Sequence, residues 1–186
     1  EIFPGDDDKK IADNFWQEQQ VAADDKLVGF NIGSAVKTKR WPPERFAQVA
    51  DALAAKGCKT VFFGGSMDEE MVEEATSLMT TTPIIATGRF TIGQLAAAMQ
   101  RCKLIITNDS GPMHVAISQK VPIVAMYGPS SPELYGPYTK DATLVTAVPP
   151  CTGCAKGMKH ECEDMQCMNR LTVEQVIEAA ENWLKN

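Results

Sequence analysis

The chain has 186 residues, of which 44% are apolar and 23% charged. This length and composition are typical of one globular domain, which at this size buries about 70% of its unfolded surface. The formal net charge of −6 argues against nucleic-acid binding, because such proteins usually carry a broad basic field. No apolar run approaches the ~20 residues of a membrane span, and no signal-peptide pattern is visible. We therefore expect a cytoplasmic protein without a transmembrane segment.

Short apolar runs alternate with amphipathic stretches along the chain, a pattern typical of strands covered by helices on both faces. The strands are expected at residues 26–32, 59–63, 83–87, 104–107, 123–127 and 143–146. The helices are expected at residues 6–20, 44–56, 69–79, 92–101, after Gly111, and at 173–184. This alternation predicts an α/β fold with a doubly wound parallel sheet. In the first helix, Ile11 and Phe15 are expected to share the inward face.

Glycines follow most of the expected strands at their carboxyl ends. Ligands bind at this edge of an open parallel sheet, and glycine lets a backbone approach a ligand closely. The glycines concerned are Gly33, Gly64, Gly65, Gly88, Gly111 and Gly128. The sequence therefore predicts a binding site built from the loops that follow the strands.

The loop at 109–114, Asp-Ser-Gly-Pro-x-His, is the most informative of these. It joins an expected strand to a helix, and the N-terminus of a helix attracts anions through free amide groups and the helix dipole. Ser110 adds a hydroxyl group, and His114 lies one turn into the helix. The alternative is structural: Asp109 or Ser110 caps the helix, and His114 is a packed histidine.

Two other loops suit an anion and a ribose. Lys39 follows the first strand and could neutralise a phosphate group; alternatively, this loop is solvated, with Trp41 packed over the next helix. Asp68 follows a Gly-Gly turn, where a carboxylate can bind ribose hydroxyls. The alternative for Asp68 is a helix cap or an acid in the first helical turn.

The six cysteines fall into two groups. Cys58 and Cys102 stand next to expected strands and are interpreted as small buried residues. The other four are Cys151, Cys154, Cys162 and Cys167, with His160 among them. Their spacing allows a zinc site, two disulfides, which are less common in a cytoplasm, or free thiols. We expect a structural or acceptor-side role for this segment rather than a catalytic one.

Four motifs in register resemble those of glycosyltransferase family 9, the lipopolysaccharide heptosyltransferases. They are Gly33-Ser34-Ala35 with Lys39-Arg40-Trp41-Pro42, Phe63-Gly64-Gly65-x-x-Asp68, Asn108-Asp109-Ser110-Gly111-Pro112-x-His114, and Val124-Ala125-x-Tyr127-Gly128-Pro129-Ser130. Cys167-Met168 before the last helix is also typical of some members. The resemblance covers nearly the whole chain in order.

The resemblance implies the C-terminal half of a two-domain GT-B glycosyltransferase. Residues 1–25 would form the interdomain linker with its helix. Residues 26–186 would form the Rossmann-like nucleotide-sugar-binding domain, including the cysteine-rich loop at 151–167 and a C-terminal helix. The acceptor site and the general base lie in the N-terminal half of such enzymes. We therefore expect no catalytic residue in this half, no transfer by this chain alone, and poor cover for Phe15, Trp16, Trp183 and Leu184.

The implied reaction is an inverting transfer of heptose from ADP-heptose to a lipid-linked core acceptor of lipopolysaccharide. Carried over by resemblance, the donor-binding residues are Ser34 and Lys39 for the phosphates, Asp68 for ribose, Phe90 beside adenine, and Asp109, Ser110, Gly111 and His114 for the diphosphate. No cofactor is required, because Lys39 and the helix end supply the positive field. The one metal that the sequence allows is a structural zinc at the late cysteines.

Two alternatives stay open. The first is a non-catalytic module that binds an adenine nucleotide on the same half-fold. The second is another GT-B enzyme, either an epimerase or a transferase that uses a UDP-sugar. Such enzymes normally show two glutamates around the last strand–helix turn, whereas residues 129–133 contain one, Glu133. For the transferase, the expected location is the cytoplasm, free or peripheral at the inner face of the inner membrane.

Overall fold

A sheet of six parallel strands forms the centre of the protein in a computed structural model, which describes residues 2–147 and 165–185. The strands are β1 (Lys26–Asn31), β2 (Cys58–Phe63), β3 (Ile84–Ile85), β4 (Leu104–Asn108), β5 (Ile123–Tyr127) and β6 (Ala142–Thr146). Their order in the sheet is β3-β2-β1-β4-β5-β6. The strand order reverses between β1 and β4, which is the Rossmann arrangement and confirms the predicted fold class.

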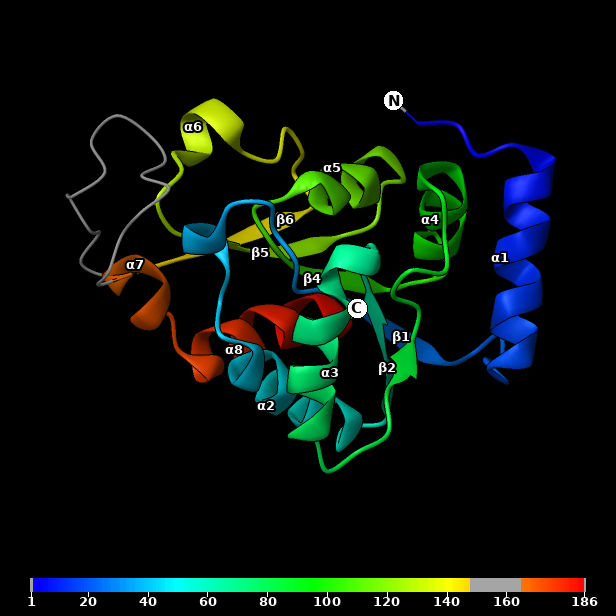
Figure 1. Ribbon diagram of the computed structural model, residues 1–186, viewed down its shortest axis with the longest axis horizontal. Coiled ribbons are helices and arrows are strands. Elements are labelled where there is room, and N and C mark those ends of the chain that lie inside the picture. The colour runs from blue at the N-terminus through cyan, green and yellow to red at the C-terminus, as the bar shows by residue number, and fades with distance from the viewer. Residues whose placement is uncertain (1, 148–164, 186) are drawn as a thin grey trace.

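Helices cover both faces of the sheet (Figure 1). They are α1 (Asp6–Glu18), α2 (Pro43–Ala54), α3 (Glu69–Ser77), α4 (Ile92–Met99), α5 (Gly111–Ser118), α6 (Pro132–Tyr135), α7 (Gln166–Asn169) and α8 (Val173–Leu184), with 3-10 turns η1 (Lys37–Lys39) and η2 (Ser66–Asp68). One apolar core lies under α2, α3, α7 and α8, and the other under α1, α4 and α5. Every residue of β4 and β5 is buried, as expected for strands enclosed by two helical layers.

The edge strand β3 is shorter than the sequence predicts. Only Ile84 and Ile85 pair as a strand, although residues 83–87 have the composition of one. Pro83 has no N–H to donate to the ladder. Beyond the strand, single hydrogen bonds still tie the chain to β2, from Ala86 N to Phe62 O at 2.9 Å and from Gly88 N to Gly64 O at 2.9 Å.

The terminal helices are well covered, so the prediction of poorly covered aromatic residues is wrong for α1. Phe15 and Trp16 are both 5% exposed, and the ring of Phe15 lies 5.0 Å from that of Phe90. The buried face of α1 consists of Ala12, Phe15 and Trp16, whereas Ile11 is 42% exposed. The inward face of this helix is therefore rotated by one residue from the predicted one.

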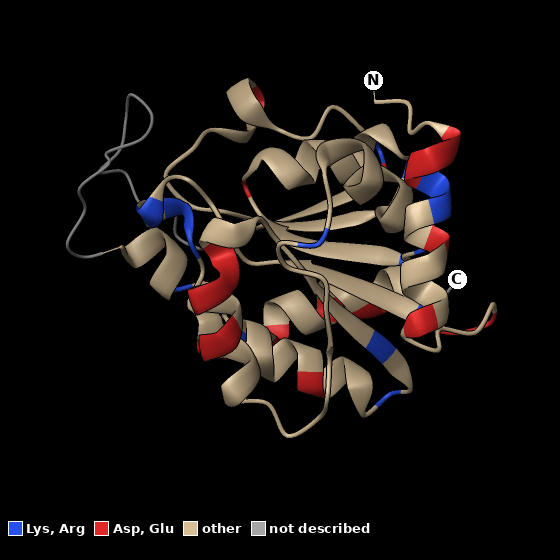
Figure 2. Cartoon of the chain, turned by 45° about the vertical axis from the view of Figure 1, so that its right-hand side comes forward, with Lys and Arg blue, Asp and Glu red and all other residues tan. Residues whose placement is uncertain are grey.

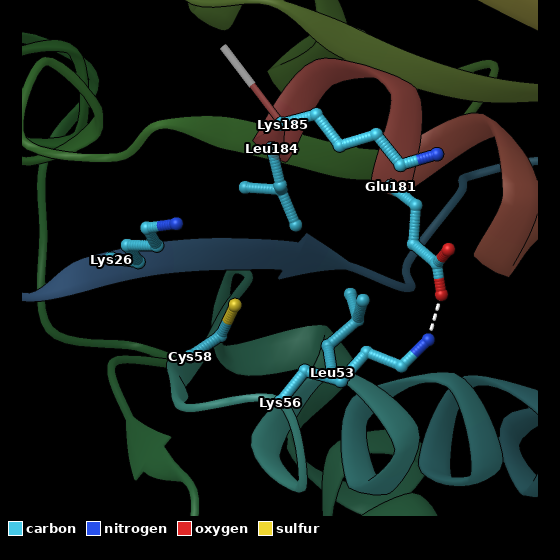
Figure 3. A pocket seen from close by; sticks show the side chains of 7 residues that line it. All are labelled: Lys26, Leu53, Lys56, Cys58, Glu181, Leu184 and Lys185. Carbon is cyan, nitrogen blue, oxygen red and sulfur yellow. Dashed lines mark hydrogen bonds and ion pairs between the residues drawn. The ribbon is translucent and has the colours of Figure 1, made fainter.

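The C-terminal helix α8 contacts the rest of the domain through both polar bonds and apolar packing. Trp183 is partly buried and donates its indole N–H to Thr143 Oγ1 at 3.0 Å. Figure 3 shows Lys56, two residues after the end of α2, paired with Glu181 of α8 beside a cavity that Leu53 and Leu184 help to line. Lys26 begins β1, so this cavity lies at the amino edge of the sheet, opposite the carboxyl ends of the strands. Trp183 and Leu184 thus pack against the domain itself.

Trp41 joins the loop after β1 to the C-terminal segment. Its side chain is fully buried, its ring lies 5.1 Å from that of Phe46, and its indole N–H donates to Leu171 O at 3.1 Å. Arg45 donates to the same carbonyl at 2.5 Å and to Asn169 O at 2.8 Å. The loop is therefore anchored rather than solvated, although Trp41 does pack on α2 as the alternative proposed.

We expect Trp41→Ala to lower the free energy of unfolding by about 3–5 kcal/mol, the usual effect of deleting a buried aromatic side chain. Trp41→Phe is the matched control: it keeps a ring and loses the hydrogen bond, for about 1 kcal/mol plus a smaller packing term. Urea unfolding followed by circular dichroism measures both. A loss below 1 kcal/mol for Trp41→Ala would contradict the anchoring role.

Candidate functional site

Buried polar side chains gather at the carboxyl ends of β1, β4 and β5. The group comprises Asn31, Ser34, Lys39, Thr107, Asn108, Asp109 and Ser130. Buried polar groups need hydrogen-bond partners, and these residues largely supply them to one another. The sheet edge where the strand order reverses therefore carries a connected polar network, at the position where open α/β sheets bind ligands.

An ion pair between Lys39 and Asp109 forms the centre of this network. Lys39 Nζ lies 2.6 Å from Asp109 Oδ2, and the two side chains are 10% and 6% exposed. Ser130 donates its hydroxyl to the same carboxylate oxygen at 2.5 Å. Lys39 Nζ also lies 5.5 Å from the centre of the Tyr135 ring. Asp109 is thus neutralised by a lysine and does not cap α5.

Burial raises the pKa of the neighbouring Tyr127 hydroxyl, and the negative charge of Asp109 raises it further. Tyr127 therefore stays neutral at physiological pH, and its hydroxyl donates to Tyr135 O at 3.1 Å. This bond connects β5 to α6, whose Tyr135 ring covers the lysine.

The N-terminus of α5 has no side-chain cap. Ser110 occupies the N-cap position without a capping hydrogen bond, and its hydroxyl oxygen instead accepts from Asn31 Nδ2 at 2.9 Å. His114 is exposed rather than packed, and a Cβ atom added at Gly111 would meet no atom of the described chain within 4 Å. The structural alternative for this loop is therefore wrong. The first amide groups of a helix lack partners within it. In α5, Pro112 has no N–H, and Met113 N donates to Ser110 O at 3.2 Å. Of the first three residues of α5, Gly111 therefore keeps an N–H for an anion.

Asp68 brings the loops after β1 and β2 together. A Cβ atom added at Gly33 would lie 2.1 Å from Asp68 Oδ1, so the carboxylate packs directly on the Gly33 backbone. Asp68 Oδ2 accepts from Gly65 N at 2.9 Å, and the side chain makes no capping bond to α3. The bond from Gly65 N belongs to a capping box at the start of η2, where Asp68 is the acid of the first turn. The structural alternative is therefore confirmed for η2, and the same carboxylate also lies between two glycine loops.

Ser34 and Phe90 lie at the sides of the network. Ser34 is buried, and its carbonyl accepts from Arg40 Nε at 2.7 Å. Phe90 is half-buried between Phe15 and Phe63, with ring centres 5.0 and 6.5 Å away. Within the described residues, Ser110 and Lys39 belong to the network at the switch point, whereas Phe90 and His114 lie outside it.

Basic and acidic side chains meet beside this edge. The basic segment at 37–40 lies next to the acidic face of α3 (Figure 2), and both line a cavity of about 410 Å³ that includes Lys37, Arg40, Glu70 and Glu74. The opposing charges leave no broad field of one sign here. A small, locally directed anion site fits this arrangement better than an extended polyanion surface.

Sequence reasoning gave no role to four residues of the network, which are Asn31, Thr107, Asn108 and Ser130. Asn108 ties two loops together, because Oδ1 accepts from Trp41 N at 3.1 Å and Nδ2 donates to Ile32 O at 2.7 Å. The Ser130 hydroxyl donates a hydrogen bond to the Asp109 carboxylate, and the Asn31 amide donates one to the Ser110 hydroxyl oxygen. The signal was present in the sequence: Asn31 and Asn108 each end an apolar strand, where an amide side chain is unusual.

The cysteine predictions are tested only in part. Cys102 is buried and Cys58 half-buried, and burial raises the pKa of both thiols, as expected for unreactive packed residues. Cys167 is buried on α7, where a Cβ atom added at Gly128 would lie 3.2 Å from its Sγ. Cys151, Cys154, Cys162 and His160 lie outside the described residues. Residues 2–147 and 165–185 contain no group of three potential metal ligands, so the zinc site stays a prediction.

Residues 5–165 match the family described as glycosyltransferase family 9 (heptosyltransferase). The chain belongs to this family. It is 34% identical over 169 residues to lipooligosaccharide heptosyltransferase 2 of Campylobacter jejuni, covering 87% of this chain and 52% of that protein. It is 31% identical over 165 residues to lipopolysaccharide heptosyltransferase 2 of Escherichia coli, covering 85% and 47%. The family resemblance inferred from the four motifs is confirmed.

A solved structure shows the same arrangement at high similarity. The glycosyltransferase family 9 structure from Veillonella parvula is 48% identical to this family 9 chain with a TM-score of 0.85, covering 98% of this chain and 53% of that one. The chain spans about half the length of the curated relatives it matches. None of the helices in the described part of the chain is long and apolar enough to cross a membrane.

Proposed function

We propose that this chain forms the donor-binding domain of an inverting heptosyltransferase that transfers heptose from ADP-heptose to the inner core of lipopolysaccharide. The names of the relatives support heptose transfer, and a solved Escherichia coli relative, 28% identical with a TM-score of 0.80, is titled an ADP-heptose heptosyltransferase. One observation carries the proposal: the uncapped N-terminus of α5 lies beside the Lys39–Asp109 pair at the switch point of the sheet.

The group that most needs stabilisation in this reaction is the leaving group, ADP. Negative charge grows on the β-phosphate of ADP as the sugar departs, and donors fixed in advance stabilise it best. Lys39 has three N–H donors and uses one on Asp109, so two remain for phosphate oxygens. The Ser110 hydroxyl and the Gly111 amide at the start of α5 add further donors. No divalent cation is part of this proposal, because these groups supply the positive field.

The remaining donor contacts follow the family resemblance. Asp68 binds the ribose hydroxyls between the glycine loops, Ser34 contacts a phosphate, and the half-exposed ring of Phe90 borders adenine. His114, exposed one turn into α5, reaches the diphosphate from the side of the helix. The lipid-linked acceptor and the general base belong to the other domain of the enzyme, which works in the cytoplasm at the inner face of the inner membrane.

We expect this chain to bind ADP more tightly than UDP or GDP, because the family resemblance assigns adenine to the side of Phe90. Isothermal titration calorimetry of the three nucleotides measures this directly. Phe90→Leu should weaken ADP binding by about tenfold, on the order of one lost base–aromatic contact. The same substitution at Phe3, which is 81% exposed, serves as the matched control and should change nothing. Tighter binding of UDP would contradict the proposal and favour a UDP-sugar enzyme.

A further inference from the structure

We infer that Asn31 is a positioning residue, which orients the Ser110 hydroxyl so that its single hydrogen points at a phosphate of the bound donor. This inference rests on the proposed function, because it requires an anion at the start of α5. Asn31 touches no part of the donor and acts through Ser110 alone.

The geometry fixes the Asn31 side chain within the sheet. Asn31 is the last residue of β1, is 1% exposed, and lies opposite Thr107 of β4 in the parallel register. Its Nδ2 atom lies 2.9 Å from Ser110 Oγ, 3.3 Å from Thr107 Oγ1 and 3.4 Å from Gly33 O. Three acceptors from three segments of the chain thus surround one amide nitrogen.

The surrounding network allows only one orientation of this amide. Thr107 donates its own hydroxyl hydrogen to Asn108 O at 2.8 Å, so its oxygen can only accept from Asn31. The Gly33 carbonyl has no hydrogen and likewise only accepts. A rotation of the amide by 180° would set its oxygen against both acceptors, and the NH2 group must therefore face Ser110.

This orientation determines the direction of the Ser110 hydroxyl. Ser110 Oγ accepts a hydrogen from Asn31, so its own hydrogen points elsewhere. The side chain is partly exposed, and it makes no capping bond to α5. The hydrogen is therefore available at the edge where Lys39 and the Gly111 amide of α5 also present donors. Without Asn31, the hydroxyl would rotate freely and could offer its lone pairs to the phosphate.

One atom of the Asn31 side chain lowers the stability of the folded protein. Its Oδ1 atom is buried and has no hydrogen-bond partner among the described residues, and an unpaired buried acceptor destabilises the folded state. The chain neighbours Phe30 and Ile32 are fully buried in the apolar core on the opposite face of the strand, whereas the Asn31 amide lies on the face that carries Thr107 and Ser110. The amide therefore points to a role in the site rather than in the core.

A double-mutant cycle between Asn31→Ala and Ser110→Ala tests the inference, with ADP and adenosine titrated by calorimetry. Ser110→Ala should weaken ADP binding about 10- to 100-fold, as for a hydrogen bond to a charged group. Asn31→Ala should weaken it about 3- to 10-fold, because the hydroxyl remains but loses its direction. The double variant should bind ADP like Ser110→Ala alone, and adenosine affinity should not change in any variant.

The inference would be overturned if the double variant lost ADP affinity by the product of the two single fold-losses. It would also be overturned if Asn31→Ala weakened adenosine binding as much as ADP binding. Failure of the unsubstituted chain to bind ADP would instead overturn the proposed function. Asn31→Asp provides a second cycle with an almost unchanged side-chain shape, should Asn31→Ala not fold. The carboxylate of Asn31→Asp can only accept a hydrogen from Ser110, so it cannot orient the hydroxyl as the Asn31 amide does. The direct effect of its negative charge on ADP affinity is the same in the Ser110 chain and in the Ser110→Ala chain, and it cancels in the cycle. The coupling between positions 31 and 110 should therefore persist.

Discussion

Replacing Lys39 by methionine is expected to weaken ADP binding by about 100-fold or more and to lower the free energy of unfolding by about 3–5 kcal/mol. The first effect follows from the loss of a cation that faces the diphosphate. The second follows from Asp109, whose side chain is 6% exposed and would lose the cation that pairs with it. Removing one member of a buried pair leaves an uncompensated charge.

Combining Lys39→Met with Asp109→Asn separates the two effects. The double variant has no buried charge at this position, so most of the stability should return, while ADP binding stays weak because the cation is still missing. Thermal unfolding and calorimetric titration of the single and double variants measure both quantities. Normal ADP binding by the double variant would show that Lys39 is structural and that the anion site lies elsewhere.

A polypeptide of these 186 residues is expected to bind ADP-heptose without transferring the sugar. A missing general base alone lowers a rate by about 10²–10⁴-fold, before the missing acceptor contacts are counted. The carboxylates near the site are engaged: Asp109 is paired with Lys39, and Asp68 accepts from Gly65 N. Glu133 accepts from the Ser131 hydroxyl, which lowers its pKa and makes it a weaker base.

Mass spectrometry of a core acceptor incubated with ADP-heptose would follow this reaction, with the full-length Escherichia coli relative as the positive control. Slow release of ADP without transfer agrees with the expectation. Transfer at a rate close to that of the control would overturn the two-domain account. It would also require a base among the residues of this chain.

The helices and strands of the fold could be predicted from the sequence because each is determined by a local pattern. The capping boxes at Thr91 with Gln94 and at Thr172 with Gln175 both form, and each starts a helix at the predicted residue. The inward face of α1 could not be found in this way. Ile11 is more apolar than Ala12, but the crowded contact with α4 favours the smaller side chain.

The loops of the candidate site could be predicted, but the contacts between them could not. Lys39 and Asp109 were each assigned to the phosphates, and only the fold shows that they neutralise each other across 70 residues of sequence. The same holds for Asn31, whose amide appears in the sequence only as an odd residue at the end of an apolar strand. Loop motifs report which groups reach an edge, whereas their hydrogen-bond partners depend on strand order and register.

The anchoring of Trp41 and Arg45 to the carbonyl groups at residues 169–171 also determines the order in which parts of the site form during synthesis. About 130 residues separate the two partners of the Trp41 bond, so the loop that carries Lys39 cannot take its final shape during early synthesis. A nascent chain that already contains β1 through β5 has every proposed donor-binding residue and still lacks the support of this loop. Competence to hold a nucleotide therefore requires that residues 169–171 have been made, and a chain interrupted before them would display strands and loops in an unfinished, aggregation-prone form.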